Sequence, residues 1–338
     1  MRLSWDMRRI HRNLPSWQGE MKGNACLHVI CERDVGLFSL VQQVVANIPW
    51  ARAEGRTPVV NFGSRTCYWT PGGYRGGGTV WEYYFEPVVP DWPVARIPEP
   101  VQVALAAAPP SPFEVGYLLD KHTFASSHFG DHPQLRGRAL AIPYKWDDPD
   151  DGIRRRAKAV IDECIRPRPY ILDKVEAFFA AHLACRPLIG VHARGTDATS
   201  TAEPREFRRG SLVLARYVAE LERLLHQWSD ARILVASDEQ ASVDYLRDCF
   251  GERVVAYGSV RHRSGQAAGQ GPTGWIMPAY IAKDRDRAAR NGEDAIVEYL
   301  LLSRCDHLVH NGSSMARTVL LNAPELAHTN THRRSALR

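Results

Sequence analysis

The segment PLIGVHARGTD (187–197) decides the fold of this chain, because an apolar run of strand length ends there in a polar cluster. The same arrangement recurs in RILVASDE (232–239) and in HLVHNGSS (307–314). Apolar residues at three- and four-residue spacing predict helices between these runs. The expected helices span 212–228, 241–250, 294–303 and 313–321, and a further strand is expected at 253–258. Strands that alternate with helices in this way predict a doubly wound domain with a parallel sheet.

A second unit of the same kind occupies residues 25–62. It begins with the apolar run ACLHVIC and ends with TPVVNF, and between them LFSLVQQVVANIPWARA (37–53) has the spacing of an amphipathic helix. Pro49 is expected to kink or shorten this helix, and Gly55 to close it. The region 152–183 predicts more helix, with an interruption near 166–169.

These patterns predict an α/β protein of two Rossmann-like domains that face each other across a cleft. A length of 338 residues suits two domains of ordinary size. The alternation of strand and helix restarts at Pro187, so we expect the boundary near Cys185. The expected domains are 1–185 and 186–338.

Composition excludes several classes of protein. The apolar fraction of 44% and the charged fraction of 24% are typical of globular chains. The net charge is +5 and no run of like charges is longer than Arg154–Arg156, so we expect no nucleic-acid partner. Arginine greatly outnumbers lysine, which is typical of a GC-rich genome, and we expect a bacterial source.

The cysteines and the N-terminus indicate the compartment. The seven cysteines are widely spread without a C-x-x-C pair, which predicts reduced and mostly buried thiols. The start, MRLSWDMRRIHRN, leads into no apolar segment of the kind that a secretory signal needs. No apolar stretch approaches the length of a membrane span. We therefore expect a cytoplasmic protein.

Polar clusters end three of the expected strands, at 192–197, 237–239 and 311–314. Because ligands of open α/β sheets sit beyond the carboxyl ends of the strands, we expect these clusters to converge on one ligand. The last cluster opens a helix, whose start favours an anion, and Arg194 adds a bidentate cationic group. A pyrophosphate fits this set. The alternative explanation of the same residues is that Ser313 or Ser314 only caps the helix and that Arg194 pairs with Asp197.

At this point the chain resembles a known family. IGVHARGTDATSTAE, ILVASDEQ and DAIVEYLLLSRCDHLVHNGSSMARTV are similar to the three donor-site motifs of the α-1,6-fucosyltransferases and Nod-factor fucosyltransferases. The resemblance covers residues 186–325, and more weakly 25–62, where GLFSLVQQVVANIPWARAEGRTPVVNF is similar to the family's first unit. It implies the two-domain GT-B fold, a GDP-fucose donor, and no metal.

The resemblance also implies roles for single residues. Arg194 corresponds to the arginine on the donor's β-phosphate, and His192 to a histidine near the nucleoside. Ser314, beside Ser313, corresponds to a phosphate-contacting serine, and Gly36 opens the first unit's helix on the donor side. Glu298 stands where the family has a guanine-binding aspartate, and Asp238 is its reserve. The candidates for the general base are Glu203, near the family's catalytic glutamate, and Glu206.

The sequence leaves two functions open. The first is an inverting, metal-independent transfer of fucose or a related sugar from a GDP-sugar to an unknown glycan, peptide or small-molecule acceptor, with no cofactor. The second is a nucleotide-sugar-binding protein of the same fold that has lost catalysis, since Gly195 and Ala198 stand where the family often has arginine and lysine. A nucleotide-sugar dehydrogenase or epimerase is a weaker third, because GGYRGGG (72–78) lacks the spacing of a dinucleotide loop.

Overall fold

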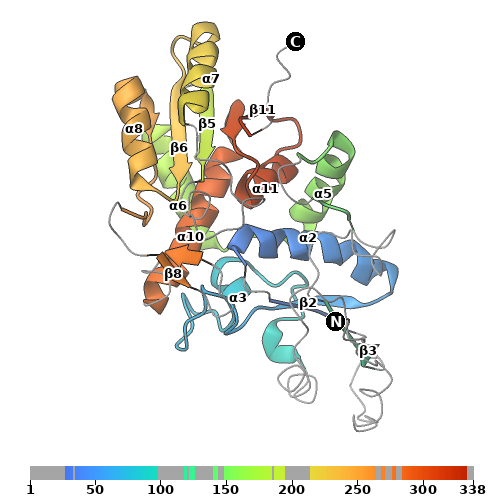
Figure 1. Ribbon diagram of the computed structural model, residues 1–338. Coiled ribbons are helices and arrows are strands. Elements are labelled where there is room, and N and C mark those ends of the chain that lie inside the picture. Colours follow the sequence, from blue (N-terminus) through green and yellow to red (C-terminus); the bar gives the residue numbers. More distant parts are fainter. Residues whose placement is uncertain are drawn as a thin grey trace, which may run out of the picture.

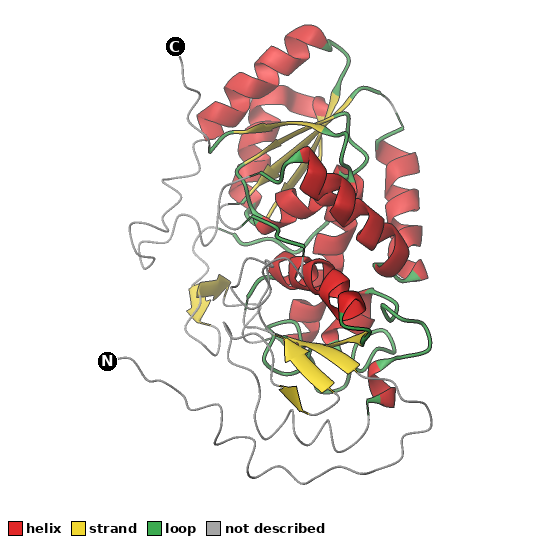
Figure 2. Ribbon diagram, turned by 90° about the vertical axis from the view of Figure 1, so that its right-hand side faces the viewer, coloured by secondary structure: helices red, strands yellow, loops and turns green. Residues whose placement is uncertain are grey.

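The computed structural model describes residues 27–32, 35–97, 118–119, 122–125, 140–143, 148–184, 186–194, 214–263, 268–270, 276–278 and 284–332. It is a mixed α/β structure with a four-stranded sheet, in the order β2-β1-β4-β3, and a five-stranded sheet, in the order β11-β10-β5-β6-β7. Figure 2 shows the two sheets one above the other, with helices between them.

The five-stranded sheet is parallel throughout and comes from the second half of the chain. Its central strand, β5 (Leu188–Ala193), is fully buried, as the apolar run predicted. The expected strands at 232–237 and 307–312 are confirmed, and the one at 253–258 is shorter than expected. The other strands are β6 (Arg232–Ser237), β7 (Val254–Val255), β10 (His307–His310) and β11 (Ala327–Asn330), the last of which was not expected.

Helices flank this sheet where the periodicity predicted them (Figure 1). The expected helix at 294–303 is longer than predicted and begins at Arg285, where Asp284 accepts a hydrogen bond from Arg287 N as the N-cap. The helices are α7 (Leu214–Gln227), α8 (Gln240–Phe250), α10 (Arg285–Leu302) and α11 (Ser314–Asn322), with a short 3-10 turn at Gly251–Arg253.

The smaller sheet confirms the first unit. β1 (Leu27–Cys31) pairs in parallel with β2 (Thr57–Asn61) and with β4 (His122–Ala125), and β3 (Leu118–Leu119) adds an antiparallel edge. Helix α2 (Leu37–Ala53) runs through Pro49 to its expected end. Gly55 closes it with a φ of 63°, a backbone conformation that glycine adopts without strain.

The aromatic segment after residue 80 forms core rather than a ligand surface. Helix α3 (Val80–Tyr84) carries it, and Thr79 caps this helix by accepting from Glu82 N. Trp81, Tyr83, Tyr84 and Phe85 are at most 2% exposed. A 3-10 turn follows at Val94–Arg96, and the strands β8 (Ala268–Gln270) and β9 (Ile276–Pro278) form an antiparallel pair.

One hydrophobic core joins the two sheets. It includes Ile30 from β1, Leu188 from β5 and Leu308 from β10, together with residues of the helices between them. Two helices that precede the expected boundary, α5 (Asp151–Cys164) and α6 (Pro169–His182), confirm the helical region and its interruption. Both contact helices of the second half, α5 with α11 and α6 with α10. The boundary near Cys185 and the cleft remain predictions, since Cys185 is outside the described residues.

Arg154 makes the contact between α5 and α11 specific. It is 6% exposed, and its guanidinium donates to the carbonyl oxygens of Leu320, Ala323 and Leu326. Leu320 is in the last turn of α11 and Ala323 is its C-cap, where carbonyl groups lack partners within the helix, and Leu326 follows three residues later. A side chain from the first half therefore completes a helix of the second.

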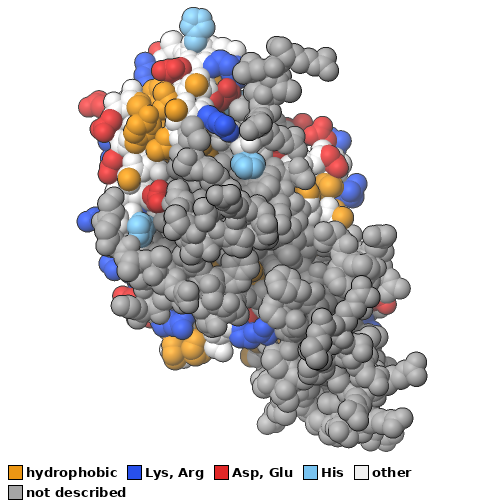
Figure 3. Space-filling view, in the orientation of Figure 1, with side chains coloured by type: hydrophobic (Ala, Val, Ile, Leu, Met, Phe, Trp, Pro, Cys, Tyr) orange, Lys and Arg blue, Asp and Glu red, His pale blue; other side chains and the backbone are white. Residues whose placement is uncertain are grey.

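The described surface carries charges of both signs. Figure 3 shows lysine and arginine side chains interspersed with aspartate and glutamate on the visible face. Among the described helices, none is long and apolar enough to cross a membrane. Four of the five described cysteines are buried, and all five are free thiols.

Candidate functional site

The carboxyl end of β5 is held from two sides through His192. His192 Nδ1 and Ser313 Oγ lie 2.9 Å apart, and Tyr217 OH on α7 donates to the His192 carbonyl oxygen at 3.1 Å. His192 is 5% exposed and Ser313 is fully buried. The structure therefore joins two of the expected site residues directly, at the edge where β5 and β10 end.

Ser313 is the N-cap of α11. Its backbone is extended, and its hydroxyl accepts a hydrogen bond from Ala316 N at 3.1 Å. The capping role that the sequence left open is thus correct for Ser313, and Ser314 is the first residue of the helix. At such a helix start, the free backbone N–H groups and the helix dipole favour an anion.

Ser314 lies against the first half of the chain. Its Oγ is 2.9 Å from Ser39 Oγ in the first turn of α2. Gln42 Nε2 donates to the Ser314 carbonyl oxygen at 2.8 Å and to Thr318 Oγ1 at 3.0 Å. Gly36, the exposed N-cap of α2, is at the same end of that helix. The starts of α2 and α11 therefore meet, although 275 residues separate the paired serines.

Arg194 follows β5 and is partly buried. Its carbonyl oxygen accepts from Asn311 Nδ2 at 3.1 Å. Burial raises the pKa of Tyr68, and the nearby Arg194 guanidinium opposes that rise. Leu37 N, in the first turn of α2, donates to Tyr68 OH at 3.4 Å. Arg194 thus brings positive charge towards the place where α2 and α11 begin.

Asp238 follows β6 at the same edge of the sheet. Its carbonyl oxygen accepts from His262 N at 2.8 Å. Arg261, in the loop after β7, donates from Nε to the Ser237 carbonyl oxygen at 3.1 Å and from Nη2 to the Tyr257 carbonyl oxygen at 2.7 Å. The loop is therefore bound to the carboxyl end of β6, beside Asp238.

Glu298 supports this loop from α10. It is 5% exposed, and its Oε1 accepts from Arg261 Nη2 at 3.0 Å and from Ser259 Oγ. Both partners use Oε1, and Oε2 takes part in no hydrogen bond with a described residue. One oxygen of Glu298, the carboxylate expected to bind guanine, is therefore already used by an ion pair inside the protein.

Two carboxyl groups on this face of α10 titrate near neutral pH. Burial raises the pKa of Glu298 to about 7, with Arg261 opposing the rise. Burial likewise raises the pKa of Asp294 to about 6, although its Oδ2 accepts from Val260 N at 3.2 Å. Carboxyl groups with such shifts cluster at functional sites in proteins.

The remaining site predictions lie outside the described residues. These are Glu203 and Glu206, the two candidates for the general base, and Asp197, the alternative partner of Arg194. The structure therefore brings together His192, Arg194, Ser313 and Ser314, and sets Asp238 and Glu298 around the neighbouring loop.

Three features that the sequence analysis passed over are clear from the structure. Ser39, Gln42 and Arg261 bind the site residues; the first two are polar positions three apart in an apolar helix, which is the signal that could have found them.

The Asp-x-Asp sequences at 148–150 and 284–286 cap helices, since Asp150 accepts from Ile153 N and Asp284 from Arg287 N. The G-x-G-x-x-G spacing at 269–274 joins antiparallel strands, whereas a dinucleotide loop joins a strand to a helix.

Several solved structures have a similar fold over most of the length of this chain. NodZ α-1,6-fucosyltransferase soaked with GDP-fucose superimposes with a TM-score of 0.51 at 14% identity, covering 88% of this chain and 93% of that one. The fucosyltransferase NodZ from Bradyrhizobium gives 0.51 at 13%, covering 89% and 93%. POFUT1 in complex with GDP-fucose gives 0.51 at 12%, covering 91% and 98%.

The similarity lies in the fold rather than in the sequence. No protein-family model matches the chain, and no curated protein matches its sequence. The chain therefore has a fucosyltransferase-like fold, and its relation to NodZ and POFUT1 is distant.

Proposed function

We propose that this chain is a glycosyltransferase that moves fucose or a related sugar from a GDP-sugar to an acceptor hydroxyl. The observation that carries the proposal is the meeting of Arg194 with the starts of α2 and α11. Some of the NodZ and POFUT1 structures that share the fold were obtained with GDP-fucose or GDP. A diphosphate would find at this edge a guanidinium and two helix N-termini.

The proposed reaction inverts the anomeric centre and needs no metal. The acceptor oxygen attacks the anomeric carbon, the bond from that carbon to the β-phosphate oxygen breaks, and the bonding pair leaves with GDP. Arg194 and the N–H groups at the start of α11 stabilise the charge that develops on the diphosphate. A carboxylate takes the acceptor's proton, and Glu203 and Glu206 are its candidates.

Glu298 is the proposed reader of the base. Guanine presents N1–H and an exocyclic amine side by side, and a carboxylate can accept both. Oε2 of Glu298 is not used by a described residue, while Oε1 already holds Arg261 and Ser259. A site of this kind rejects adenine and uracil because its polar group stays unpaired. Asp238 remains the reserve.

The second candidate function is binding without catalysis. The contacts around Arg194, Ser313 and Ser314 serve donor binding in either case, so they do not decide between the two. The discriminating group is the base. Turnover that is lost in Glu203→Gln or Glu206→Gln, with GDP affinity unchanged, supports the enzyme. Donor binding without hydrolysis or transfer in the wild type supports the binding protein.

The first test measures nucleotide binding by calorimetry with GDP, UDP, ADP, TDP and CMP. We expect GDP to bind most tightly, and at 100 times its dissociation constant it should stabilise the fold by about 2.7 kcal/mol. Equal affinities, or a preference for UDP or TDP, would contradict the donor assignment. Turnover that disappears in EDTA and returns with manganese would contradict metal independence.

The second test replaces Arg194. Arg194→Ala should lose about 3 kcal/mol of transition-state stabilisation in kcat/KM, as other preorganised donors do. Arg194→Lys keeps the charge but loses the planar fork, and it should also lose most activity. Kinetics like the wild type in Arg194→Ala would refute the proposed diphosphate site.

A further inference from the structure

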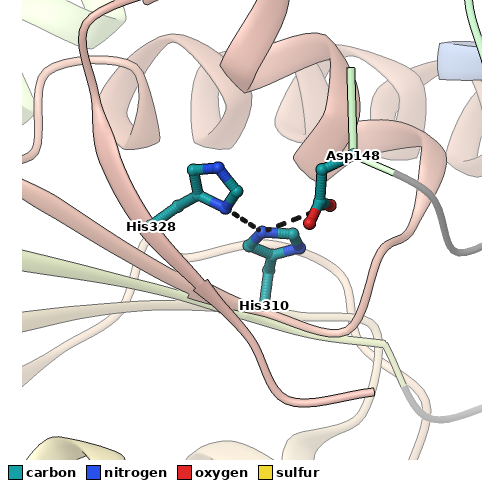
Figure 4. Close-up of side chains that lie close together, drawn as sticks. All are labelled: Asp148, His310 and His328. Carbon is teal, nitrogen blue, oxygen red and sulfur yellow. Dashed lines mark hydrogen bonds and ion pairs between the residues drawn. The ribbon is translucent and has the colours of Figure 1, made fainter. Parts of the chain in front are cut away.

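Histidines from three neighbouring strands lie beneath the turn that opens α11. His310 on β10 is in register with His192 on β5, and β10 also pairs with β11, which carries His328. Figure 4 shows His310 between His328 and Asp148. His310 Nε2 is 3.1 Å from His328 Nδ1 and 3.9 Å from Asp148 Oδ1, and His310 is fully buried.

The hydrogen bonds of His310 determine where its proton is. Gly312 N–H donates to His310 Nδ1 at 3.0 Å, and a backbone N–H can only donate. Nδ1 therefore carries a lone pair, so neutral His310 has its proton on Nε2. That N–H faces His328 Nδ1, which must accept. The order of the bonds thus runs from Gly312 N–H through His310 to His328.

A metal ion does not fit this arrangement. Asp148, His310 and His328 offer ligand atoms within 4.8 Å of one another. A metal on His310 Nε2 would need the lone pair there, while Gly312 N–H uses the one on Nδ1. A metal-binding histidine normally donates its other N–H to an oxygen, which is the reverse of what His310 does.

The described groups that most affect the pKa of His310 favour its neutral form. Burial lowers its pKa well below the usual value, and His328, His192, Arg317 and His307 lower it further. Asp148 is the acidic group nearby, and its Oδ1 is occupied by Asn330 Nδ2 at 3.0 Å. His310 is therefore a neutral imidazole at neutral pH, and its Nδ1 accepts the bond from Gly312.

We propose that His310 is a positioning residue that sets the donor-phosphate turn, acting through its hydrogen bond from Gly312. Gly312 has a φ of 71°, and the next residue, Ser313, is the cap of α11 and the partner of His192. With Gly312 N–H held by His310, the turn can present Ser313 and Ser314 in one geometry. His328 fixes the tautomer that this bond requires. The inference rests on the proposed donor site.

The test compares two substitutions that differ in one acceptor. In His310→Asn the side-chain oxygen stands at the place of Nδ1 and can still accept from Gly312. In His310→Leu no acceptor remains, and the buried N–H is left unpaired. We expect GDP affinity, measured by calorimetry, to fall about tenfold in His310→Leu, the scale of one lost hydrogen bond, and to stay within about threefold of wild type in His310→Asn.

A second measurement keeps the inference testable if His310→Leu does not fold. Nitrogen-15 NMR of the wild type should find His310 with Nδ1 unprotonated and Nε2 protonated, and His328→Leu should change the His310 signals. A protonated Nδ1, or tight zinc binding that His328→Leu abolishes, would overturn the assignment.

The outcomes separate this inference from the function on which it rests. If the wild type binds no GDP, the proposed function fails, whatever the NMR result. If the wild type binds GDP and His310→Leu binds it equally well, the positioning role fails and the proposed function stands. Equal loss in His310→Leu and His310→Asn, with equal melting temperatures, also contradicts the role, because it removes the link to the acceptor.

Discussion

Two buried glutamates on α10 have pKa values that are shifted in opposite directions. Glu293 is fully buried, and it accepts from Tyr74 OH at 2.8 Å, from Arg75 Nε at 3.3 Å and from Lys174. Burial favours a higher pKa for Glu293, but Lys174, Tyr74 and Arg75 outweigh it and hold the pKa below its usual value. It is therefore an anion at neutral pH.

Glu298 is on the same helix and is nearly as buried. Among the described residues its cationic partner is Arg261, and burial raises its pKa to about 7. Glu293 accepts from two cations and a tyrosine, whereas Glu298 accepts from one cation and a serine, and its burial outweighs them. The first half of α10 thus anchors the chain's two halves together, while the second half keeps a carboxyl group whose charge is easily changed beside the candidate site. The following predictions test that division.

The largest effect should come from Gly292→Ala, in the anchoring half. A Cβ at Gly292 would lie 2.3 Å from Tyr84 Oη, and Tyr84 is fully buried and donates to the Ala289 carbonyl oxygen at 2.7 Å. The overpacked contact should lower the free energy of unfolding by about 3 kcal/mol, measured in urea.

Gly258→Ala is the matched control for this overpacking, since nothing lies within 4 Å of a Cβ there. Its stability should stay within about 0.5 kcal/mol of the wild type. Adding Tyr84→Phe to Gly292→Ala should recover part of the loss. If both alanine variants are equally stable, the close approach of α3 and α10 is wrong.

Next in size is Glu293→Gln. It leaves Lys174 and Arg75 without their anion, but these are 34% and 50% exposed, so water replaces part of the interaction. We expect a loss of about 2 kcal/mol in the free energy of unfolding, below the range for fully buried pairs. The kcat of the folded fraction should be unchanged. A large loss of GDP affinity would place Glu293 in the site and end the comparison.

Glu298→Gln should instead change the nucleotide preference and leave the stability nearly unchanged. Burial already leaves Glu298 partly protonated at neutral pH, and glutamine keeps an oxygen for Arg261 and Ser259, so the stability at neutral pH should change by less than about 1 kcal/mol. The preference for GDP over UDP should fall about tenfold, which calorimetry measures directly. An unchanged preference would move the reading of the base to Asp238 or elsewhere.

The last comparison is the dependence of stability on pH. Between its ordinary pKa of 4.5 and about 7, folded Glu298 holds a proton that the unfolded chain releases. Its contribution to the free energy of unfolding therefore falls as the pH rises, by about 1.4 kcal/mol per unit. Glu293 has the opposite sign, because its lowered pKa gives stability that is lost in acid.

The measurement is urea unfolding of the wild type and both glutamine variants from pH 3 to pH 8. Subtraction from the wild type removes His28 and His310, whose lowered pKa values make the protein less stable as the pH falls below their ordinary value. The difference curve for Glu298 should change between pH 4.5 and about pH 7, and the curve for Glu293 should change in the opposite direction below pH 4.5. Parallel curves would show that the two carboxyl groups share one environment.

The fold could be predicted from the sequence wherever the apolar pattern was regular. β5 and β6 carry continuous apolar runs, and both were found where they were expected. The first turns of α10 were missed because RDRAARNGED has no apolar stripe, and its burial depends on Tyr84 and on the partners of Glu293. β11 was missed for the same reason, since AHTN is a strand only through its pairing with β10.

The candidate site divides in the same way. The residues that end strands, His192, Arg194 and Ser313, could be placed from the chain alone because parallel strands end at a common edge. The contact of Ser39 with Ser314 could not, since it joins segments 275 residues apart. Nor does a sequence reveal that Glu298 already holds Arg261, because that depends on the path of the loop after β7.

The contact between α2 and α11 has a consequence for motion. Many two-domain proteins admit and release ligands by rotating one domain about a hinge. Here such a rotation would break the buried bond from Gln42 to Thr318 and open a core that spans both sheets. We therefore expect the two halves to stay together when a ligand enters or leaves.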